Sequence, residues 1–108
     1  MHYLLMYDFV DDYVQRRSEF RDAHLTQAWT AQKRGDMMLA GAFTDPVDGA
    51  ILIFKGDSPA AAEEFAKNDV YVKNGLVKKW RVRGWTTVVG DQATTPVHPA
   101  TTAAPAAT

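Results

Sequence analysis

Apolar and aromatic side chains fill most of the first stretch of the chain, HYLLMYDF at positions 2–9, and this pattern predicts a strand. From position 12 to 34 the apolar residues recur every three or four positions, which predicts a long helix that ends at Gly35. Two short apolar runs follow at 37–44 and 49–56, and the DPVDG between them predicts a hairpin turn. The first half of the chain is therefore expected to form a strand, a helix and a hairpin.

The second half of the chain predicts another helix and a last strand. Ser58 is expected as the N-cap of this helix, with Pro59 at its first position and an Ala-rich stretch after it. A short turn through VYVKNG then leads to the last predicted strand at 77–89. The order of the elements is β-α-β-β-α-β, which is typical of a ferredoxin-like α+β fold.

Both faces of the first three predicted strands are apolar. Alternate side chains of a strand point to opposite faces of the sheet. In the first strand, Leu4 and Met6 are expected on one face and Leu5 and Phe9 on the other. The second strand divides in the same way into Met37 and Leu39 against Met38 and Ala40, and the third into Leu52 and Phe54 against Ile51 and Ile53. Two helices cover one face of a four-stranded sheet, so the second apolar face needs another cover. A second copy of the chain supplies one by symmetry. We therefore predict a homodimer whose two sheets face each other.

Three cationic or titratable residues lie on the apolar side of the first predicted helix. Arg17, Arg21 and His24 follow i, i+4, i+7 spacing, so their side chains form one stripe. A buried guanidinium without a partner is costly, so each must meet an anion or a polar cavity. Asp69 takes an inward position at the end of the second predicted helix, where the partial negative charge of a helix C-terminus disfavours a carboxylate. We therefore predict a His24–Asp69 pair flanked by Arg17 or Arg21.

The same residues also have a purely structural interpretation. A lone histidine on an apolar helix face is usually a satisfied core residue, and buried ion pairs often only fix the packing of helices. Tyr71, beside Asp69 in the predicted turn, is expected to form a pocket wall. Other aromatic residues are expected in the core, namely Tyr3, Tyr7, Phe9 and Trp29.

Composition and charge remove several classes of function. The 108 residues are enough for one domain. The 12 basic and 13 acidic residues give a net charge of −1, so the chain has no general attraction for nucleic acid or anionic membranes. The basic segment KKWRVRGW alternates as a strand with one polar side, which is typical of a protected edge rather than a nucleic-acid site. We expect no nucleic-acid partner.

Metal, cofactor and membrane functions also lack sequence support. The chain has no cysteine, its three histidines share no metal-ligand spacing, and it has no glycine motif for nucleotide binding, so we expect neither a metal nor a cofactor. No segment approaches the roughly 20 apolar residues of a membrane span, and the N-terminus lacks a basic leader. The sequence therefore predicts a cytoplasmic protein without a membrane partner.

The composition changes near Gly90. From there to the C-terminus the chain is dominated by Thr, Ala and Pro and has no aromatic residue, so it has too little apolar surface to form a core. We therefore divide the chain into a folded domain at 1–89 and a low-complexity tail at 90–108.

The candidate residues occur in segments that resemble the YciI-like, or YCII-related, family. RSEFRDAHL at 17–25 fits an R-x-x-x-R-x-x-H-L helix motif, GDMMLAGAF follows it, and NDVYVKNGLVKKWRV fits the family's D-P-Y-V-x-x-G ending. The resemblance covers residues 1–89 and implies a dimeric α+β barrel with a ferredoxin-like protomer. It also implies that His24 and Asp69 form the family's proposed active-site pair.

Two positions depart from the family pattern. Val70 replaces the usual proline after Asp69, and Ala50 occupies a position where some members have a serine, so a His–Asp–Ser arrangement is not expected here. One branch of the family dehydrochlorinates chlorinated hydroxyquinols. The resemblance therefore implies a lyase-type enzyme that acts on a small aromatic or anionic substrate.

The leading hypothesis gives each candidate residue a role. His24 would act as general acid/base, Asp69 would orient its imidazole, Arg17 and Arg21 would hold an anionic substrate oxygen, and Tyr71 would line the site. One alternative is a non-catalytic ligand-binding or assembly module whose buried charges are structural. Another is an isomerase or a cofactor-free monooxygenase, activities found in other dimeric α+β barrels.

Overall fold

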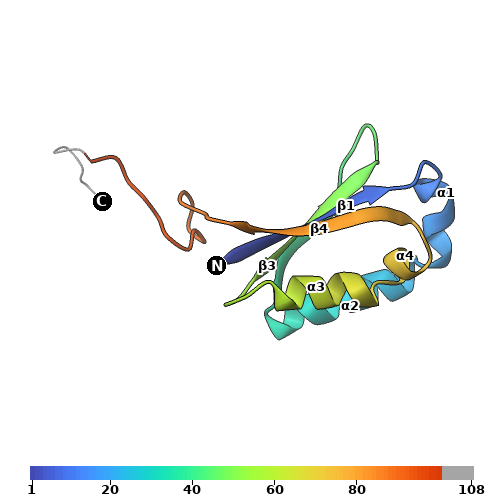
Figure 1. The fold of residues 1–108 in the computed structure, drawn as a ribbon, viewed down its shortest axis with the longest axis horizontal. Coiled ribbons are helices and arrows are strands. Elements are labelled where there is room, and N and C mark those ends of the chain that lie inside the picture. Colours follow the sequence, from blue (N-terminus) through green and yellow to red (C-terminus); the bar gives the residue numbers. More distant parts are fainter. Residues whose placement is uncertain (101–108) are drawn as a thin grey trace.

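The computed structural model describes residues 1–100, which form an antiparallel four-stranded sheet with its helices on one face (Figure 1). The elements in chain order are β1 (His2–Phe9), α1 (Tyr13–Arg16), the 3-10 helix η1 (Arg17–Glu19), α2 (Arg21–Arg34), β2 (Met37–Ala42), β3 (Gly49–Lys55), α3 (Ala60–Asn68), α4 (Val70–Lys73) and β4 (Val77–Trp85). The strand order is β2-β3-β1-β4. The predicted ferredoxin-like α+β fold is confirmed.

The first helical segment is interrupted, so the prediction of one helix over 12–34 is wrong. It divides into α1, η1 and α2, and Phe20 lies at the junction before α2 with φ −113° and ψ −3°. A straight helix of this length would reach about 34 Å, whereas the eight-residue β1 spans only about 27 Å. The interruption lets the chain bend at the end of the sheet, where Tyr13 stacks on Phe9 with 3.6 Å between ring centroids. Gly35 ends α2 as predicted, with the positive φ of 91° that a left-handed C-cap requires.

The β2–β3 hairpin differs from the prediction in its faces. Met37 pairs with Phe54 and Leu39 with Ile53, so the register shifts by one residue at the intervening Met38. Met37 is consequently buried on the helix side, whereas Leu39 lies on the other face and is 69% exposed. The prediction that Met37 and Leu39 share a face is wrong because a bulge reverses the alternation of side chains. The strand also ends at Ala42 rather than at residue 44.

The boundaries of the later elements shift by a few residues. α3 begins at Ala60, one residue later than predicted, and the backbone N–H of Ala60 donates to Ser58 Oγ at 3.2 Å. The VYVKNG turn contains the one-turn helix α4. β4 ends at Trp85 rather than at residue 89, because the chain then folds back and Thr95 and Val97 donate to the backbone of residues 87 and 88.

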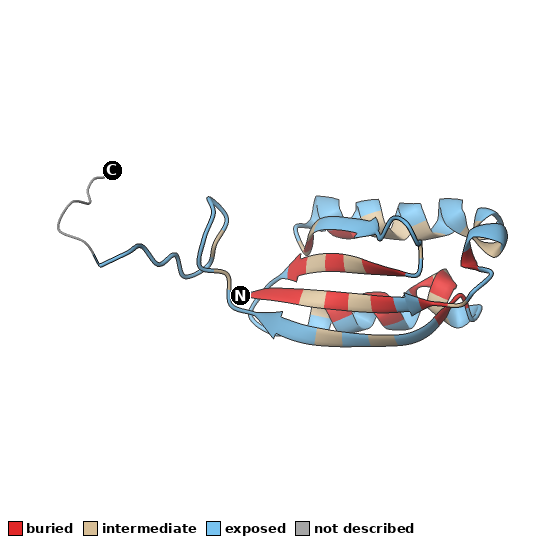
Figure 2. Ribbon diagram, turned by 90° about the horizontal axis from the view of Figure 1, so that it is seen from above, coloured by how far each residue is buried: buried red, intermediate tan, exposed pale blue. Residues whose placement is uncertain are grey.

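The core lies between the sheet and the helices. Its largest fully buried apolar or aromatic side chains are Leu5, Tyr7, Phe54, Tyr71 and Leu76, and Figure 2 shows buried residues concentrated on the central strands. The opposite face of the sheet is apolar at the half-buried Leu4, Met6, Ile51 and Ile53. On this face the edge strand β4 carries exposed basic side chains, as predicted for a protected edge.

The C-terminal segment adds little to this core. No residue from 90 to 100 is buried, and the rest of the predicted tail, 101–108, lies outside the described residues. Across residues 1–100, none of the helices combines the length and the apolar character needed to cross a bilayer.

Candidate functional site

Asp69 lies at the junction of α3 and α4 and belongs to both helix ends. It is the C-cap of α3 and the N-cap of α4, and its Oδ1 accepts a hydrogen bond from the backbone N–H of Tyr71 at 3.0 Å. A carboxylate at an N-cap is favoured by the helix backbone. The unfavourable C-terminus of α3 at Asp69 is therefore offset by the N-terminus of α4, because the predicted turn is itself a short helix.

Two side chains complete the hydrogen bonding of the buried carboxylate. The hydroxyl of Tyr7 donates to Oδ2 at 2.7 Å, and His24 Nδ1 lies 2.9 Å from Oδ1 and 3.0 Å from Oδ2. The Asp69 side chain has no solvent exposure, so these donors replace its lost hydration. An ionised carboxylate can only accept, so His24 Nδ1 carries the donated hydrogen and Nε2 is the nitrogen left for other chemistry.

Aromatic rings hold the His24 imidazole on more than one side. Tyr71 stacks on it with 4.0 Å between centroids and 13° between planes, and Phe65 approaches edge-on at 6.2 Å. Tyr13 in turn packs edge-on against Tyr71 at 5.5 Å. With its Nδ1 bonded and its ring face covered, His24 has one well-defined orientation, and its side chain is 16% exposed.

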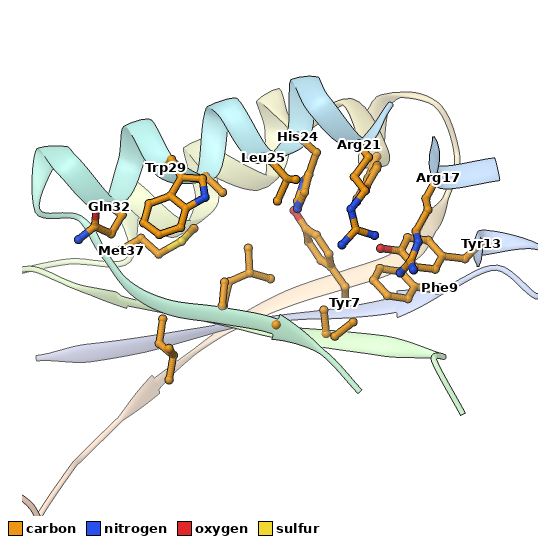
Figure 3. A pocket seen from close by; sticks show the side chains of 18 of the residues that line it. Tyr7, Phe9, Tyr13, Arg17, Arg21, His24, Leu25, Trp29, Gln32 and Met37 are labelled. Carbon is orange, nitrogen blue, oxygen red and sulfur yellow. The ribbon is translucent and has the colours of Figure 1, made fainter. Parts of the chain in front are cut away.

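A cavity of about 520 Å³ lies between α2 and the helix-facing side of the sheet (Figure 3). Arg17 and Arg21 lie at one end of it, and His24 and Tyr7 occupy its middle (Figure 3). The other end is formed by Leu25, Ala28, Trp29, Gln32 and Met37. The structure thus brings the five predicted site residues, His24, Asp69, Arg17, Arg21 and Tyr71, into and around one cavity.

The two arginines lie on the same side of the His24–Asp69 pair along the cavity and do not bond to it. Among residues 1–100 no carboxylate lies within ion-pair distance of Arg17 or Arg21. The Arg17 guanidinium lies 5.6 Å from the centroid of the Tyr13 ring, which is a favourable cation–π distance. The sequence predicted that each arginine would meet either an anion or a polar cavity. Within residues 1–100 the structure shows the cavity and no protein anion.

Both tyrosines next to the pair are held neutral. The pKa of Tyr7 is raised by burial and further by the charge and hydrogen bond of Asp69. Burial also raises the pKa of Tyr71, Tyr13 adds to the rise, and the charges of Arg21 and Arg17 oppose it. Tyr7 and Tyr71 are consequently hydrogen-bond donors at any pH near neutrality.

Of the aromatic residues predicted in the core, Tyr7 has an additional role and Trp29 does not lie in the core. Tyr7 is buried as expected but also bonds Asp69, a role that could have been inferred because a buried phenol needs a polar partner. Trp29 was predicted in the core, yet it is 62% exposed at the cavity. That prediction is wrong because α2 does not pack closely on the sheet at this point.

In the described part of the chain, no group of three or more histidine, cysteine or acidic side chains is placed to hold a metal ion.

Comparison with known proteins supports the fold and the family. The structure is similar to that of a 5-chloro-2-hydroxyhydroquinone dehydrochlorinase, TftG, from Burkholderia phenoliruptrix AC1100 in complex with 2,5-dihydroxybenzoquinone. The TM-score is 0.68 and the identity 21%, over 81% of this chain and 95% of that one. No curated protein matches the sequence. The YCII-related domain matches residues 1–86, which is most of the chain, and this protein therefore belongs to the YCII-related family.

Proposed function

We propose that this protein is a small-molecule enzyme of the lyase type in which Nε2 of His24 is the general acid/base. One observation carries the proposal: the fully buried Asp69 holds His24 Nδ1 at 2.9 Å, and the imidazole lines a cavity of about 520 Å³. A histidine fixed in this way has one nitrogen committed to orientation and one available for proton transfer.

The chemical step would be an elimination. Nε2 removes a proton from a carbon or oxygen of the substrate, and the released electron pair forms a new double bond. The leaving group departs with its own bonding electrons, as chloride does in a dehydrochlorination. Asp69 stabilises the imidazolium that forms, and the proton then passes from Nε2 to solvent, so that the acid HX is lost in total.

Arg17, Arg21 and Tyr71 would bind the substrate beside this base. The two guanidiniums have no carboxylate partner within residues 1–100 and line the cavity, so they can hold an anionic oxygen. Tyr71 forms a wall of the cavity and keeps the imidazole plane fixed. The likeness in fold to a dehydrochlorinase, at 21% identity, supports the choice of elimination among the possible reactions.

An assay of chloride release tests this assignment. The protein is offered 5-chloro-2-hydroxyhydroquinone and a panel of related chlorinated phenols, and the rate on any compound converted is compared with that of His24→Gln and Asp69→Asn. We expect a loss of about 100-fold or more in kcat for His24→Gln, since general acid–base catalysis contributes about 10²–10⁴-fold. His98→Gln, which changes an exposed histidine of the tail, is the matched control. Full activity of His24→Gln would refute the proposal, and tight binding without turnover of any compound would favour the non-catalytic alternative.

We also infer that the bare face of the sheet is covered by a second copy of the chain. The face is apolar at Leu4, Met6, Ile51 and Ile53, and no helix within residues 1–100 covers it (Figure 1). Light scattering should give twice the chain mass of 12.0 kDa. Ile51→Glu should shift the protein to monomer, whereas Lys33→Glu on the solvent side of α2 should not. A monomeric parent protein at micromolar concentration would contradict this inference.

A further inference from the structure

The cavity beside His24 has two chemically different ends. Arg21, Leu25 and Trp29 are spaced by four residues along α2, so they line the cavity one turn after another. One turn of helix advances about 5.4 Å, and the path from Arg21 to Trp29 is therefore about 12 Å. Figure 3 shows the arginines at one end, Trp29 and Met37 toward the other, and His24 between them.

The first end carries positive charge that the described protein does not neutralise. Arg17 of η1 and Arg21 of α2 line the same end of the cavity, so two positive charges are gathered there. Neither has an ion-pair partner among residues 1–100. Guanidinium groups bind carboxylates through charge-assisted hydrogen bonds, often two at a time, so the two arginines at this end favour a carboxylate as ligand. The neutral hydroxyl of Tyr71 adds no competing negative charge.

The second end exposes large apolar side chains. Trp29 is 62% exposed and Leu25 38% exposed, while Met37 beneath them is buried. An exposed indole over a cavity offers a flat surface for an aromatic or branched hydrocarbon group, and burying it would gain hydrophobic energy. Gln32 lies at this end as well and carries no charge.

From this arrangement we infer that the natural ligand of the cavity is an elongated organic acid. Its carboxylate lies between Arg17 and Arg21, its aromatic or branched apolar group packs on Leu25 and Trp29, and the atom that reacts lies between the two ends, against His24. The position of the reacting atom rests on the proposed function. The polarity of the ligand does not, because it follows from the two ends of the cavity alone.

Binding of three matched probes tests the polarity. The acid 4-phenylbutanoate has both an anionic and an aromatic end, 4-phenylbutan-1-ol lacks the charge, and butanoate lacks the ring. Titration calorimetry on the intact protein should give an affinity for 4-phenylbutanoate about 10- to 100-fold higher than for either of the other two. Binding should also shield Trp29 and change the tryptophan fluorescence, and Trp29→Phe should remove most of that change.

Variants assign each end of the ligand to its residues. Arg17→Gln combined with Arg21→Gln should lower the affinity for the acid to that of the alcohol and leave the affinity for the alcohol unchanged. Trp29→Ala should weaken both ring-bearing probes by a similar factor and leave butanoate unaffected. Lys33→Gln, on the solvent side of α2, is the control for general loss of charge, and circular dichroism verifies that each variant is folded.

The outcomes separate this inference from the proposed function. The binding measurements use the parent protein and need no turnover, so they can be made whether or not an activity has been found. Equal affinity for the acid and the alcohol, unchanged binding of the acid by the arginine variants, or no binding of the acid at millimolar concentration would each overturn the inference, even if His24 proves catalytic. Preference for the acid without any His24-dependent turnover would leave the inference standing and overturn only the proposed function.

Discussion

The two long helices cover the same face of the sheet but pack on it differently. α3 has nine residues and buries Ala62, Phe65 and Ala66, whereas α2 has fourteen residues and buries only Ala31. Phe65 packs against Phe54 of the sheet with 5.6 Å between ring centroids. Trp29 of α2 faces a cavity instead.

This difference shows how a small domain can hold both a core and a cavity on one sheet face. Hydrogen bonds to the neighbouring helix, rather than a packed apolar face, hold α2 in place. Gln27 Nε2 donates to the carbonyl of Phe65 at 3.0 Å, and His24 bonds Asp69. These polar tethers connect α2 to α3 and to the α3–α4 junction. The side of α2 that faces the sheet consequently lines the cavity.

Truncation of one aromatic residue on each helix should give the largest contrast in stability. Phe65→Ala should lower the free energy of unfolding by about 3–5 kcal/mol, since it removes a buried ring and leaves a cavity. Trp29→Ala should cost less than about 1 kcal/mol, although the side chain is larger, because 62% of its surface is already exposed. Urea unfolding followed by circular dichroism measures both. Equal losses would mean that α2 packs on the sheet as tightly as α3.

Removal of the charge that tethers α2 should have the next largest effect. Asp69→Asn should lower the free energy of unfolding by about 1–3 kcal/mol, because an amide cannot accept from His24, Tyr7 and the Tyr71 backbone as a carboxylate does. Asp36→Asn breaks the exposed pair with Arg34 and should cost about 0–1 kcal/mol. If both substitutions cost the same, the buried carboxylate does not hold the two helices together.

Alkaline pH should reveal the contribution to stability of the buried Tyr7, which bonds Asp69 from β1. The raised pKa keeps Tyr7 protonated in the folded protein, whereas the unfolded chain releases this proton near the ordinary tyrosine value of 10.0. The stability from Tyr7 is therefore complete below pH 10 and is lost progressively as the pH rises above it, at about 1.4 kcal/mol per pH unit. Between pH 10 and 11 the unfolded phenol is only partly ionised, so Tyr7→Phe should reduce the slope of unfolding free energy there by about 1 kcal/mol per pH unit. An unchanged slope would contradict burial of the phenol beside Asp69.

Deletion of the tail should have the smallest effect and would test whether the domain ends near residue 89. Removal of residues 91–108 should change the free energy of unfolding by less than about 0.5 kcal/mol, because no residue from 91 to 100 is buried. The buried His2 keeps its hydrogen bond to Thr87, which is retained in the shortened chain. A loss above about 2 kcal/mol would place the tail in the stable fold and would contradict the division at Gly90.

The spacing of residues along the chain was sufficient to predict the order of elements and the residues that meet at the site. Periodicity is a local property, so the alternation in β1 and the grouping of Arg17, Arg21 and His24 on one side could be recognised without coordinates, although Arg17 lies in η1 and not in α2. The inward position of Asp69 at the end of the second helix then indicated a partner for His24. Their contact follows because the fold lays both helices on one face of the sheet.

The tertiary structure alone decided how these elements fit together. The bend at Phe20 at the end of the sheet and the bulge at Met38 between two paired strands could not be inferred from the local periodicity. The hydrogen bond from Tyr7 to Asp69 joins residues that are 62 positions apart. The separation of α2 from the sheet is likewise a balance of packing and polar tethers across the whole domain. For that reason the sequence could name the His24–Asp69 pair and a polar cavity as one surrounding for the arginines, but not the apolar end of that cavity, where Trp29 is exposed.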